Sequence, residues 1–403
     1  MKLKQTLILL SILTSGCSSS RPEPMSQVID RAFNRAYEQT TYLASQLKTD
    51  SLALPRTTDA QGRLVTSDSR WWTSGFFPGT LWYLFEYTHD RQILELARDF
   101  TTRVEREQYT TDNHDVGFIL NCSFGNGYRL TGDEQYRAIL LQGASSLATR
   151  FRPLSGVIQS WDIAPWSTRL GWQCPVIIDN MMNLELLTRA SELSGDPRFR
   201  KMAVAHAETT RKNHFRKDHS SYHVVSYDTL SGRPHLHITK QGYSDSSAWA
   251  RGQAWALYGF SMMYRETGEE RYLQQAELIA DFLLRHPRLP EDMVPYWDFD
   301  APGIPDAPRD ASAAAVMASA LVELSQASQD PEAARKYREA AQMQIRSLAA
   351  DTYLAAPGTN GGFILKHSVG SLPDNSEVDV PLTYADYYFL EAMLRYKAAY
   401  PED

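Results

Sequence analysis

Residues 174–187 are Cys174-Pro175-Val176-Ile177-Ile178-Asp179-Asn180-Met181-Met182-Asn183-Leu184-Glu185-Leu186-Leu187. The apolar run at 176–178 precedes a helical pattern that places Met182 and Leu186 on one face. Asp179 stands between the two, so we expect it at a helix N-terminus with its backbone enclosed. A carboxylate in that position is either an N-cap, which accepts amide hydrogens of the next turn, or a catalytic acid.

The helix that begins in this stretch belongs to a repeat. It ends at the turn 194–197, and turns of similar type occur at 87–90, 131–133, 267–269 and 325–331. Each turn follows a helical segment rich in small, aromatic and apolar residues, and each precedes an amphipathic segment with a charged face. The first kind of helix is expected at about 78–87, 116–130, 180–193, 248–267, 312–325 and 384–399. The second kind is expected at 25–46, after the turn at 87–90, and at 136–150, 199–212, 272–285 and 333–348.

Six buried and six amphipathic helices in alternation predict an all-α (α/α)6 barrel with six inner and six outer helices. Residues 25–403 would form this single domain. A superhelical solenoid has the same pattern and stays open as the alternative, because periodicity does not reveal closure. In either fold the inner helices start on one side, where their tryptophan-rich leading segments would form the aromatic wall that a sugar site requires.

The composition restricts the partners. The chain has 403 residues and a formal net charge of −7, so a nucleic-acid partner is not expected, because it would need a basic face. Apart from Cys17, the cysteines are Cys122 and Cys174, and two buried free thiols are the default, with one bridge between them left open. The chain has no thiolate cluster and no nucleotide-binding loop, so no metal and no cofactor are expected.

The N-terminus has the pattern of a targeting segment. Lysines precede the short apolar run 6–13, which predicts a signal peptide over residues 1–16. Leu13-Thr14-Ser15-Gly16-Cys17 resembles the lipobox of bacterial lipoproteins. We therefore expect an exported, periplasmic lipoprotein attached to the membrane through Cys17, with residues 17–24 as a linker; a soluble secreted protein is the alternative.

Three segments together resemble a known family. They are His114-Asp115-Val116-Gly117-Phe118, Asp179-Asn180-Met181-Met182-Asn183-Leu184 and Trp249-Ala250-Arg251-Gly252-Gln253-Ala254-Trp255-Ala256-Leu257-Tyr258-Gly259. They are similar to glycoside hydrolase family 88, the unsaturated glucuronyl hydrolases and unsaturated chondroitin disaccharide hydrolases. The resemblance implies an (α/α)6 barrel that hydrates the 4,5-unsaturated uronate left by polysaccharide lyases at the non-reducing end of an oligosaccharide.

The resemblance also implies roles for individual residues. Asp179 matches the general acid/base, which must have a raised pKa, and Asp115 matches a second carboxylate whose charge could help to raise it. Gln241, His223 and Arg251 match substrate-contacting positions.

Several of these assignments have alternatives. Asp115, like Asp179, could be a helix cap, and His223 could be a structural or surface histidine. Arg251 could instead form a buried ion pair with Asp245 or Asp310. Trp249 and Trp255 are six residues apart and cannot share a helical face, so one could stack on the sugar while the other packs; Trp161 is a further stacking candidate.

One departure from the family bears on the substrate. Some members carry a loop with serine and lysine that accepts a sulfate, whereas residues 367–377 of this chain contain acids and no lysine. This difference weakens the case for sulfated substrates. The rival functions are an unsaturated rhamnogalacturonyl hydrolase, a sugar epimerase of the α-barrel type, which would use a pair of histidines, and a non-catalytic carbohydrate-binding protein.

Overall fold

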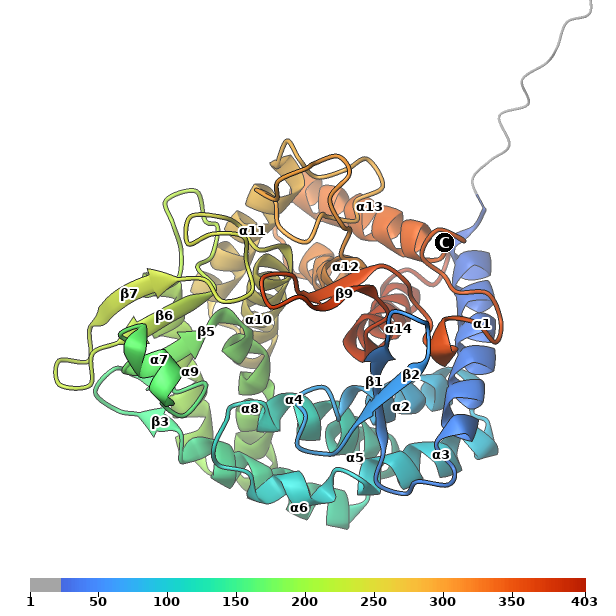
Figure 1. Ribbon diagram of the computed structural model, residues 1–403, viewed down its shortest axis with the longest axis horizontal. Helices are drawn as coiled ribbons and strands as arrows, with labels where there is room; N and C mark the ends of the chain where they lie inside the picture. Colours follow the sequence, from blue (N-terminus) through green and yellow to red (C-terminus); the bar gives the residue numbers. More distant parts are fainter. Residues whose placement is uncertain (1–22) are drawn as a thin grey trace, which may run out of the picture.

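The computed structural model describes residues 23–403, so the predicted signal peptide and Cys17 lie outside the described part of the chain. Inner and outer helices alternate around a ring (Figure 1). The outer helices are α1 (Met25–Gln46), α3 (Arg91–Thr102), α6 (Glu134–Ala148), α9 (Pro197–Asn213), α11 (Glu270–Arg285) and α13 (Pro331–Leu348). The inner helices are α2 (Phe76–Thr88), α4 (Val116–Leu120) continued by α5 (Asn126–Thr131), α8 (Leu184–Ser194), α10 (Ala250–Thr267), α12 (Ala311–Ala327) and α14 (Thr383–Ala399).

Two inner helices are less regular than the sequence pattern predicted. One turn of π-helix, Asn121–Gly125, joins α4 to α5, and a 3-10 helix, Ile178–Asn183, precedes α8. Extra turns of this kind are frequent at functional sites, and the 3-10 helix carries Asp179.

The loops contain short antiparallel sheets that the helical pattern did not predict. They are β1 (Leu54–Thr58) with β2 (Leu64–Ser67), β3 (Phe151–Arg152) with β4 (Val157–Ile158), β5 (Cys174–Ile177) with β6 (Val224–Tyr227) and β7 (Pro234–Ile238), and β8 (Ser368–Ser371) with β9 (Ser376–Val380). A short helix, α7 (Pro165–Arg169), and 3-10 helices at Glu105–Tyr109 and Asn360–Gly362 complete the loops. In the described part of the chain no helix is long and apolar enough to cross a membrane.

The repeated turns work as a stop signal followed by a start signal. Gly132 and Gly195 end inner helices with φ of 67° and 73°, a left-handed conformation that glycine adopts without strain. Asp133 and Asp196 follow directly and accept the backbone N–H two residues ahead, at 2.9 Å in each case, so they cap the next outer helix. The Gly-Asp pair therefore reverses the chain between an inner helix and an outer one.

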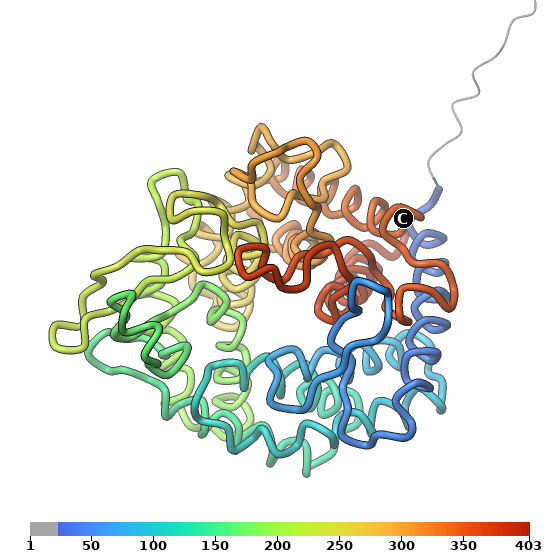
Figure 2. Tube along the Cα trace, viewed as in Figure 1, coloured from blue at the N-terminus to red at the C-terminus, as the bar shows by residue number. Residues whose placement is uncertain are grey.

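The ring is closed, so the predicted barrel is confirmed and the solenoid alternative is wrong. The last inner helix, α14, packs against the first, α2, with the rings of Tyr387 and Phe76 5.4 Å apart. The chain runs once around the ring, and its described start meets its end (Figure 2), where Ser26 N–H donates to the Asp403 carbonyl at 3.2 Å.

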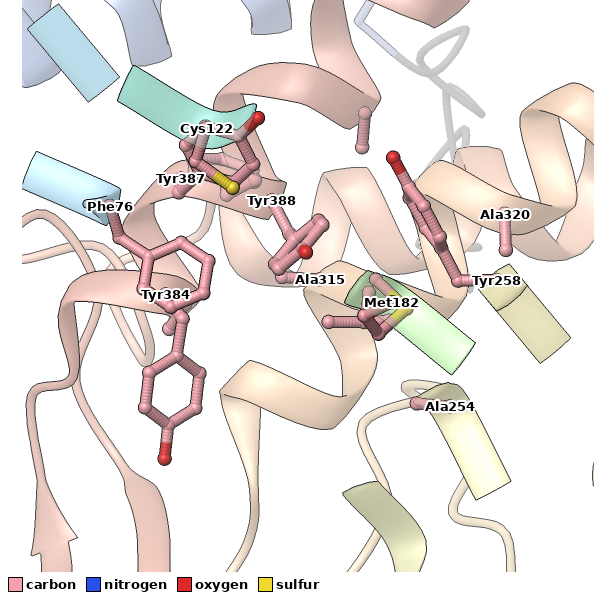
Figure 3. Close-up of a cluster of buried hydrophobic side chains, with 14 of the residues drawn as sticks. Phe76, Cys122, Met182, Ala254, Tyr258, Ala315, Ala320, Tyr384, Tyr387 and Tyr388 are labelled. Carbon is pink, nitrogen blue, oxygen red and sulfur yellow. The ribbon is translucent and has the colours of Figure 1, made fainter. Parts of the chain in front are cut away.

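The core combines small and aromatic side chains. Ala315 and Ala320 of α12 lie among the tyrosines that α10 and α14 contribute (Figure 3). Small residues let inner helices approach closely, and the aromatic rings fill the remaining space at interior density. Cys122 and Cys174 are buried in separate clusters as free thiols, which confirms the default expectation.

One buried carboxylate connects four inner helices. Glu391 of α14 accepts hydrogen bonds from Tyr83 of α2 at 2.7 Å, Tyr258 of α10 at 3.1 Å and Ser319 of α12 at 2.6 Å. Arg395, one turn later on α14, lies 3.3 Å away and balances its charge. Glu391 is only 5% exposed, so each of these partners replaces water that the carboxylate has lost.

Glu391→Gln should lower the free energy of unfolding by about 2–4 kcal/mol, because the amide nitrogen cannot accept a hydrogen bond and Arg395 keeps only Glu323 as an ion-pair partner. Chemical denaturation measures the change. The control is Glu192→Gln, the same replacement at an exposed position of α8, which should change stability by less than about 0.5 kcal/mol. Equal losses of stability in the two variants would show that the Glu391 hydrogen bonds do not stabilise the barrel.

Candidate active site

Strand β5 leads directly into the 3-10 helix that carries Asp179, at the start of an inner helix. Ile177, the last residue of β5, pairs with Val224 of β6, and Ile178 N–H donates to the carbonyl of His223 at 2.9 Å. The chain then turns through the 3-10 helix that contains Asp179. This pairing brings His223 beside Asp179, with Nε2 and Oδ1 3.8 Å apart.

A close approach of two inner helices places Asp115 beside Asp179. A Cβ on Gly117 would lie 2.5 Å from Cα of Asn183, so the start of α4 fits against the 3-10 helix only because position 117 is glycine. Asn183 completes the contact, since its Oδ1 accepts from Phe118 N–H at 2.7 Å. The first two motifs of the sequence are thus a single structural unit.

Neither carboxylate is a helix cap. Asp115 precedes α4 and Asp179 lies within the 3-10 helix, and neither accepts the backbone hydrogen bonds that a cap would make. Asp310 shows the contrast, because it caps α12 by accepting from Ser312 N–H at 3.0 Å. The capping interpretation of Asp115 and Asp179 is therefore wrong.

The absence of capping bonds leaves both carboxyl groups costly to ionise. Burial raises the pKa of Asp179 to about 7, and it outweighs the nearby positive charge of Arg251 and the indole N–H of Trp255, which favour the ionised form. Burial also raises the pKa of Asp115 to about 7, and repulsion from Asp179 adds to the rise. Near neutral pH the pair can hold and release a proton.

A neutral histidine faces each carboxylate. His223 Nδ1 accepts the backbone N–H groups of Lys240 at 3.0 Å and Gln241 at 3.1 Å, so its proton lies on Nε2, toward Asp179. Burial, followed by the charge of Arg251, lowers the pKa of His223 to about 3. The ring is therefore an uncharged hydrogen-bond donor.

His114 repeats this arrangement at the other carboxylate. Asn183 Nδ2 donates to His114 Nδ1 at 3.3 Å, which leaves the proton on Nε2, 3.4 Å from Oδ1 of Asp115. Burial lowers the pKa of His114 to about 3, so it is also neutral. Neither Nε2 forms a hydrogen bond in the structure, so the two uncharged rings lie close to the carboxyl groups without abolishing their raised pKa.

A cavity of about 410 Å³ opens above these groups. Its wall combines aromatic and polar side chains, as a sugar site requires. The lining residues are Trp71, Trp72, Trp161, Trp166, Lys240, Gln241, Arg251, Gly370, Ser371, Asp374, Ser376, Glu377 and Tyr384. Asp115 and Asp179 are not among these lining residues. Gln241 and Arg251 connect the cavity to them, because Gln241 binds His223 next to Asp179 and the charge of Arg251 acts on Asp179.

Arg251 forms the buried ion pair that was considered for it, and it also lines the cavity. It forms the buried ion pair with Asp310 at 3.1 Å, and Asp245 is not its partner. It also donates to the carbonyls of Val369 and Gly370 while lining the cavity. Its guanidinium therefore holds the β8–β9 hairpin at the cavity edge and supplies positive charge to the site.

The predicted aromatic residues separate into two groups. Trp161 lies on the cavity wall, with its ring stacked on Trp172 at 6.0 Å. Trp249 and Trp255 are buried behind the wall: Trp249 packs on His223 at 4.6 Å, and Trp255 packs on Phe118 at 5.3 Å. These contacts make Trp249 and Trp255 supports of the catalytic region.

Several residues of the cavity wall were not predicted as site residues from the sequence. Trp71, Trp72 and Tyr384 stand in the segments that lead into inner helices, so their position was a usable signal. Lys240 had no such signal, because a loop's place at the mouth depends on the folded barrel. The hairpin residues 370–377 fall in the segment 367–377, to which the family resemblance pointed. Gln241 was predicted, and its Nε2 donates to the Gly370 carbonyl at 3.1 Å.

A second cavity of about 600 Å³ lies at the opposite ends of the inner helices. It contains no predicted site residue, and its arginines are paired with glutamates, for example Arg129 with Glu86 at 2.6 Å and Arg265 with Glu323 at 2.8 Å. Within residues 23–403, no three His, Cys, Asp or Glu side chains are grouped as a metal site.

Comparisons with known proteins agree with this geometry. The family model of Glycosyl Hydrolase Family 88 matches residues 51–358. The chain belongs to this family. A family 88 relative from Formosa agariphila, an unsaturated glucuronyl hydrolase, is 46% identical over 328 residues, which are 81% of this chain and 80% of the relative. An unsaturated chondroitin disaccharide hydrolase from Streptococcus pyogenes is 34% identical, over 93% of this chain and 91% of the relative.

A solved family 88 structure, an unsaturated glucuronyl hydrolase specific for heparin, is 47% identical, with a TM-score of 0.89, and covers 94% of this chain and 99% of that chain. The resemblance stated from the three motifs is thus confirmed, and this family 88 chain is a glycoside hydrolase with the α/α-barrel fold.

Asp179→Asn should change how stability depends on pH. In the folded protein Asp179 keeps its proton up to a pKa of about 7, whereas an unfolded chain releases it near the ordinary value of 3.8. Folded wild-type protein therefore loses stability as pH rises between about 4 and 7, and the asparagine variant lacks this loss.

The variant should match wild type in free energy of unfolding at pH 4 and exceed it by about 2–4 kcal/mol at pH 8. Denaturation at both pH values measures the difference. Asp306→Asn, at an exposed position, is the control for removal of one acid and should change the free energy of unfolding by less than about 0.5 kcal/mol. A constant difference at the two pH values would contradict the raised pKa of Asp179.

Proposed function

We propose that this chain releases the 4,5-unsaturated uronate from the non-reducing end of lyase-generated oligosaccharides of the glycosaminoglycan type. The observation that carries the proposal is the pair Asp179, which is buried, and Asp115, which is partly buried. Neither has capping bonds, each has a pKa of about 7, and both accompany an aromatic cavity in a family 88 chain. Proton transfer to carbon requires an acid that is still protonated near neutral pH.

The proposed reaction uses the acid form of Asp179 first. Asp179 donates its proton to C4 of the unsaturated ring, and positive charge develops at C5 and the ring oxygen. Water then adds to C5 while the Asp179 carboxylate accepts a proton from it. The resulting hemiketal opens and the rest of the saccharide leaves, so one water is consumed for each bond cleaved and Asp179 regains its proton.

The neighbouring groups have supporting roles in this proposal. Asp115 contacts the uronate and, when ionised, keeps the proton on Asp179. The Nε2–H groups of His114 and His223 lie close to the two carboxyl groups, and Arg251 and Gln241 face the sugar from the cavity wall. Trp72, Trp161 and Tyr384 offer apolar faces to sugar rings.

We further propose heparin-type disaccharides as the preferred substrates, since the 47% identical relative is specific for heparin. An epimerase would use two histidines for proton transfer, but burial lowers the pKa of His114 and His223 to about 3, which makes both poor bases at neutral pH.

A panel of lyase-generated disaccharides from chondroitin, hyaluronan, heparin and pectin tests the activity, through the loss of ultraviolet absorption by the conjugated double bond. Heparin disaccharides should be turned over fastest, and the pectin-derived substrate represents the rhamnogalacturonyl alternative. Asp179→Asn should fold normally and reduce kcat by ~10²–10⁴, because the amide has no proton to transfer. Turnover of the variant at the wild-type rate would remove Asp179 from the chemistry.

We propose that the protein is exported and attached to a membrane through lipidated Cys17, on the basis of the charged, apolar and lipobox-like pattern of residues 1–17. Cys17→Ser should move the protein from the membrane fraction to the soluble fraction while specific activity stays unchanged. Labelling with a radioactive fatty acid should mark wild type and not the variant. Wild-type protein found without lipid in the soluble fraction would contradict the anchor.

A further inference from the structure

An ion pair closes one side of the cavity. Lys240 follows β7 and places Nζ on both carboxylate oxygens of Asp374, at 2.6 Å from Oδ2. Asp374 lies in the turn of the β8–β9 hairpin and also accepts from Ser371 Oγ at 2.7 Å. Lys240, Asp374 and Ser371 all line the cavity. A lysine thus reaches the hairpin from a distant segment, although the hairpin itself contains none.

The hairpin that presents Asp374 is firmly held. Arg251 donates to its carbonyls, Gln241 donates to Gly370, and Arg56 contacts Glu377 at 2.5 Å. Asn375 and Glu377 have φ of 48° and 56°, which are strained values for residues with a side chain. Strain of this kind persists only where surrounding contacts enforce it, so the position of Asp374 is determined by the fold.

The pair lies on the side away from proton transfer. The backbone N–H of Lys240 binds His223 Nδ1, and the opposite side of that ring faces Asp179. The ammonium group extends from this anchor toward the hairpin. A uronate at Asp179 would therefore leave Lys240 and Asp374 beside the next sugar, the one that departs.

The charged side chains that line the cavity are two cations and two acids. The cations are Lys240 and Arg251, and the first is bound to Asp374 while the second is bound to Asp310 and two carbonyls. The acids are Asp374 and Glu377. A sulfate on the departing sugar would meet a lysine whose charge is already neutralised, next to a carboxylate that repels it.

We propose that Asp374 is a specificity-determining residue that holds Lys240 and thereby disfavours substrates with a sulfate on the departing sugar. This inference rests on the proposed hydrolysis of unsaturated disaccharides. Lys240 would be the cation that binds the sulfate once Asp374 no longer holds it. The enzyme would then act on fragments from which sulfate is absent or has been removed at this position.

The test compares an unsulfated unsaturated heparin disaccharide with those that carry one sulfate on the glucosamine, either N-linked or on O6. Asp374→Asn keeps the size of the side chain and releases Lys240. We expect the ratio of kcat/KM for sulfated over unsulfated substrate to rise about tenfold for at least one of the two positions, and the gain to shrink as salt is added.

The double variant Lys240→Gln with Asp374→Asn separates capture by lysine from simple loss of repulsion. We expect the double variant to lose the rise in the kcat/KM ratio of sulfated over unsulfated substrate. Asp306→Asn, which removes an exposed acid outside the cavity wall, controls for net charge and should leave the ratio unchanged.

An unchanged ratio in Asp374→Asn at both sulfate positions, or a gain that persists in the double variant, would overturn the inference while the proposed hydrolysis stands. Failure of the wild-type chain to hydrolyse any unsaturated disaccharide would overturn both.

Discussion

The barrel depends on how its inner helices are joined around the axis, and Glu391 is the clearest case. A buried carboxylate is stable only if donors replace its lost water, and these donors come from α2, α10 and α12. The contact therefore connects the first inner helix to the last three. A closed ring then sets the diameter of the mouth, and with it the distance between loops that are far apart in the sequence.

At the other end of the same helices, the candidate active site holds carboxylates that lack the donors which surround Glu391. Asp179 is buried about as deeply as the structural carboxylate Glu391, and Asp115 keeps 15% of its side chain exposed, but the fold supplies neither with capping bonds. Their ionised forms are consequently expensive, and the raised pKa values follow. The close contact between Gly117 and Asn183 keeps the carboxyl groups of Asp115 and Asp179 together. The free-energy cost of ionising them is therefore imposed by helix packing outside the two carboxyl groups themselves.

The short sheets position what the helices cannot. The β5–β6 pairing brings His223 to Asp179 across 44 residues of sequence (223 − 179). The β8–β9 hairpin covers the cavity edge and is held by Arg251 from α10, which is itself paired with Asp310 at the start of α12. One guanidinium thus links two inner helices and a loop and acts on Asp179 through its charge, which explains why an arginine is placed there and a lysine is not.

The sequence alone determined the alternation of inner and outer helices, their bounds to within a few residues, and the motifs with Asp115, Asp179 and Arg251. These features depend on local periodicity, on turn residues such as Gly195 and Asp196, and on short motifs, all of which are visible along the chain.

Only the tertiary structure decided that the ring closes and that Asp115 and Asp179 are unpaired acids and not caps. It also decided that Arg251 pairs with Asp310 and that Lys240 reaches the hairpin. Trp249 and Trp255 proved to be buried outside the cavity lining. Each of these facts depends on which distant groups replace water around a side chain, and that replacement exists only after long-range packing has formed.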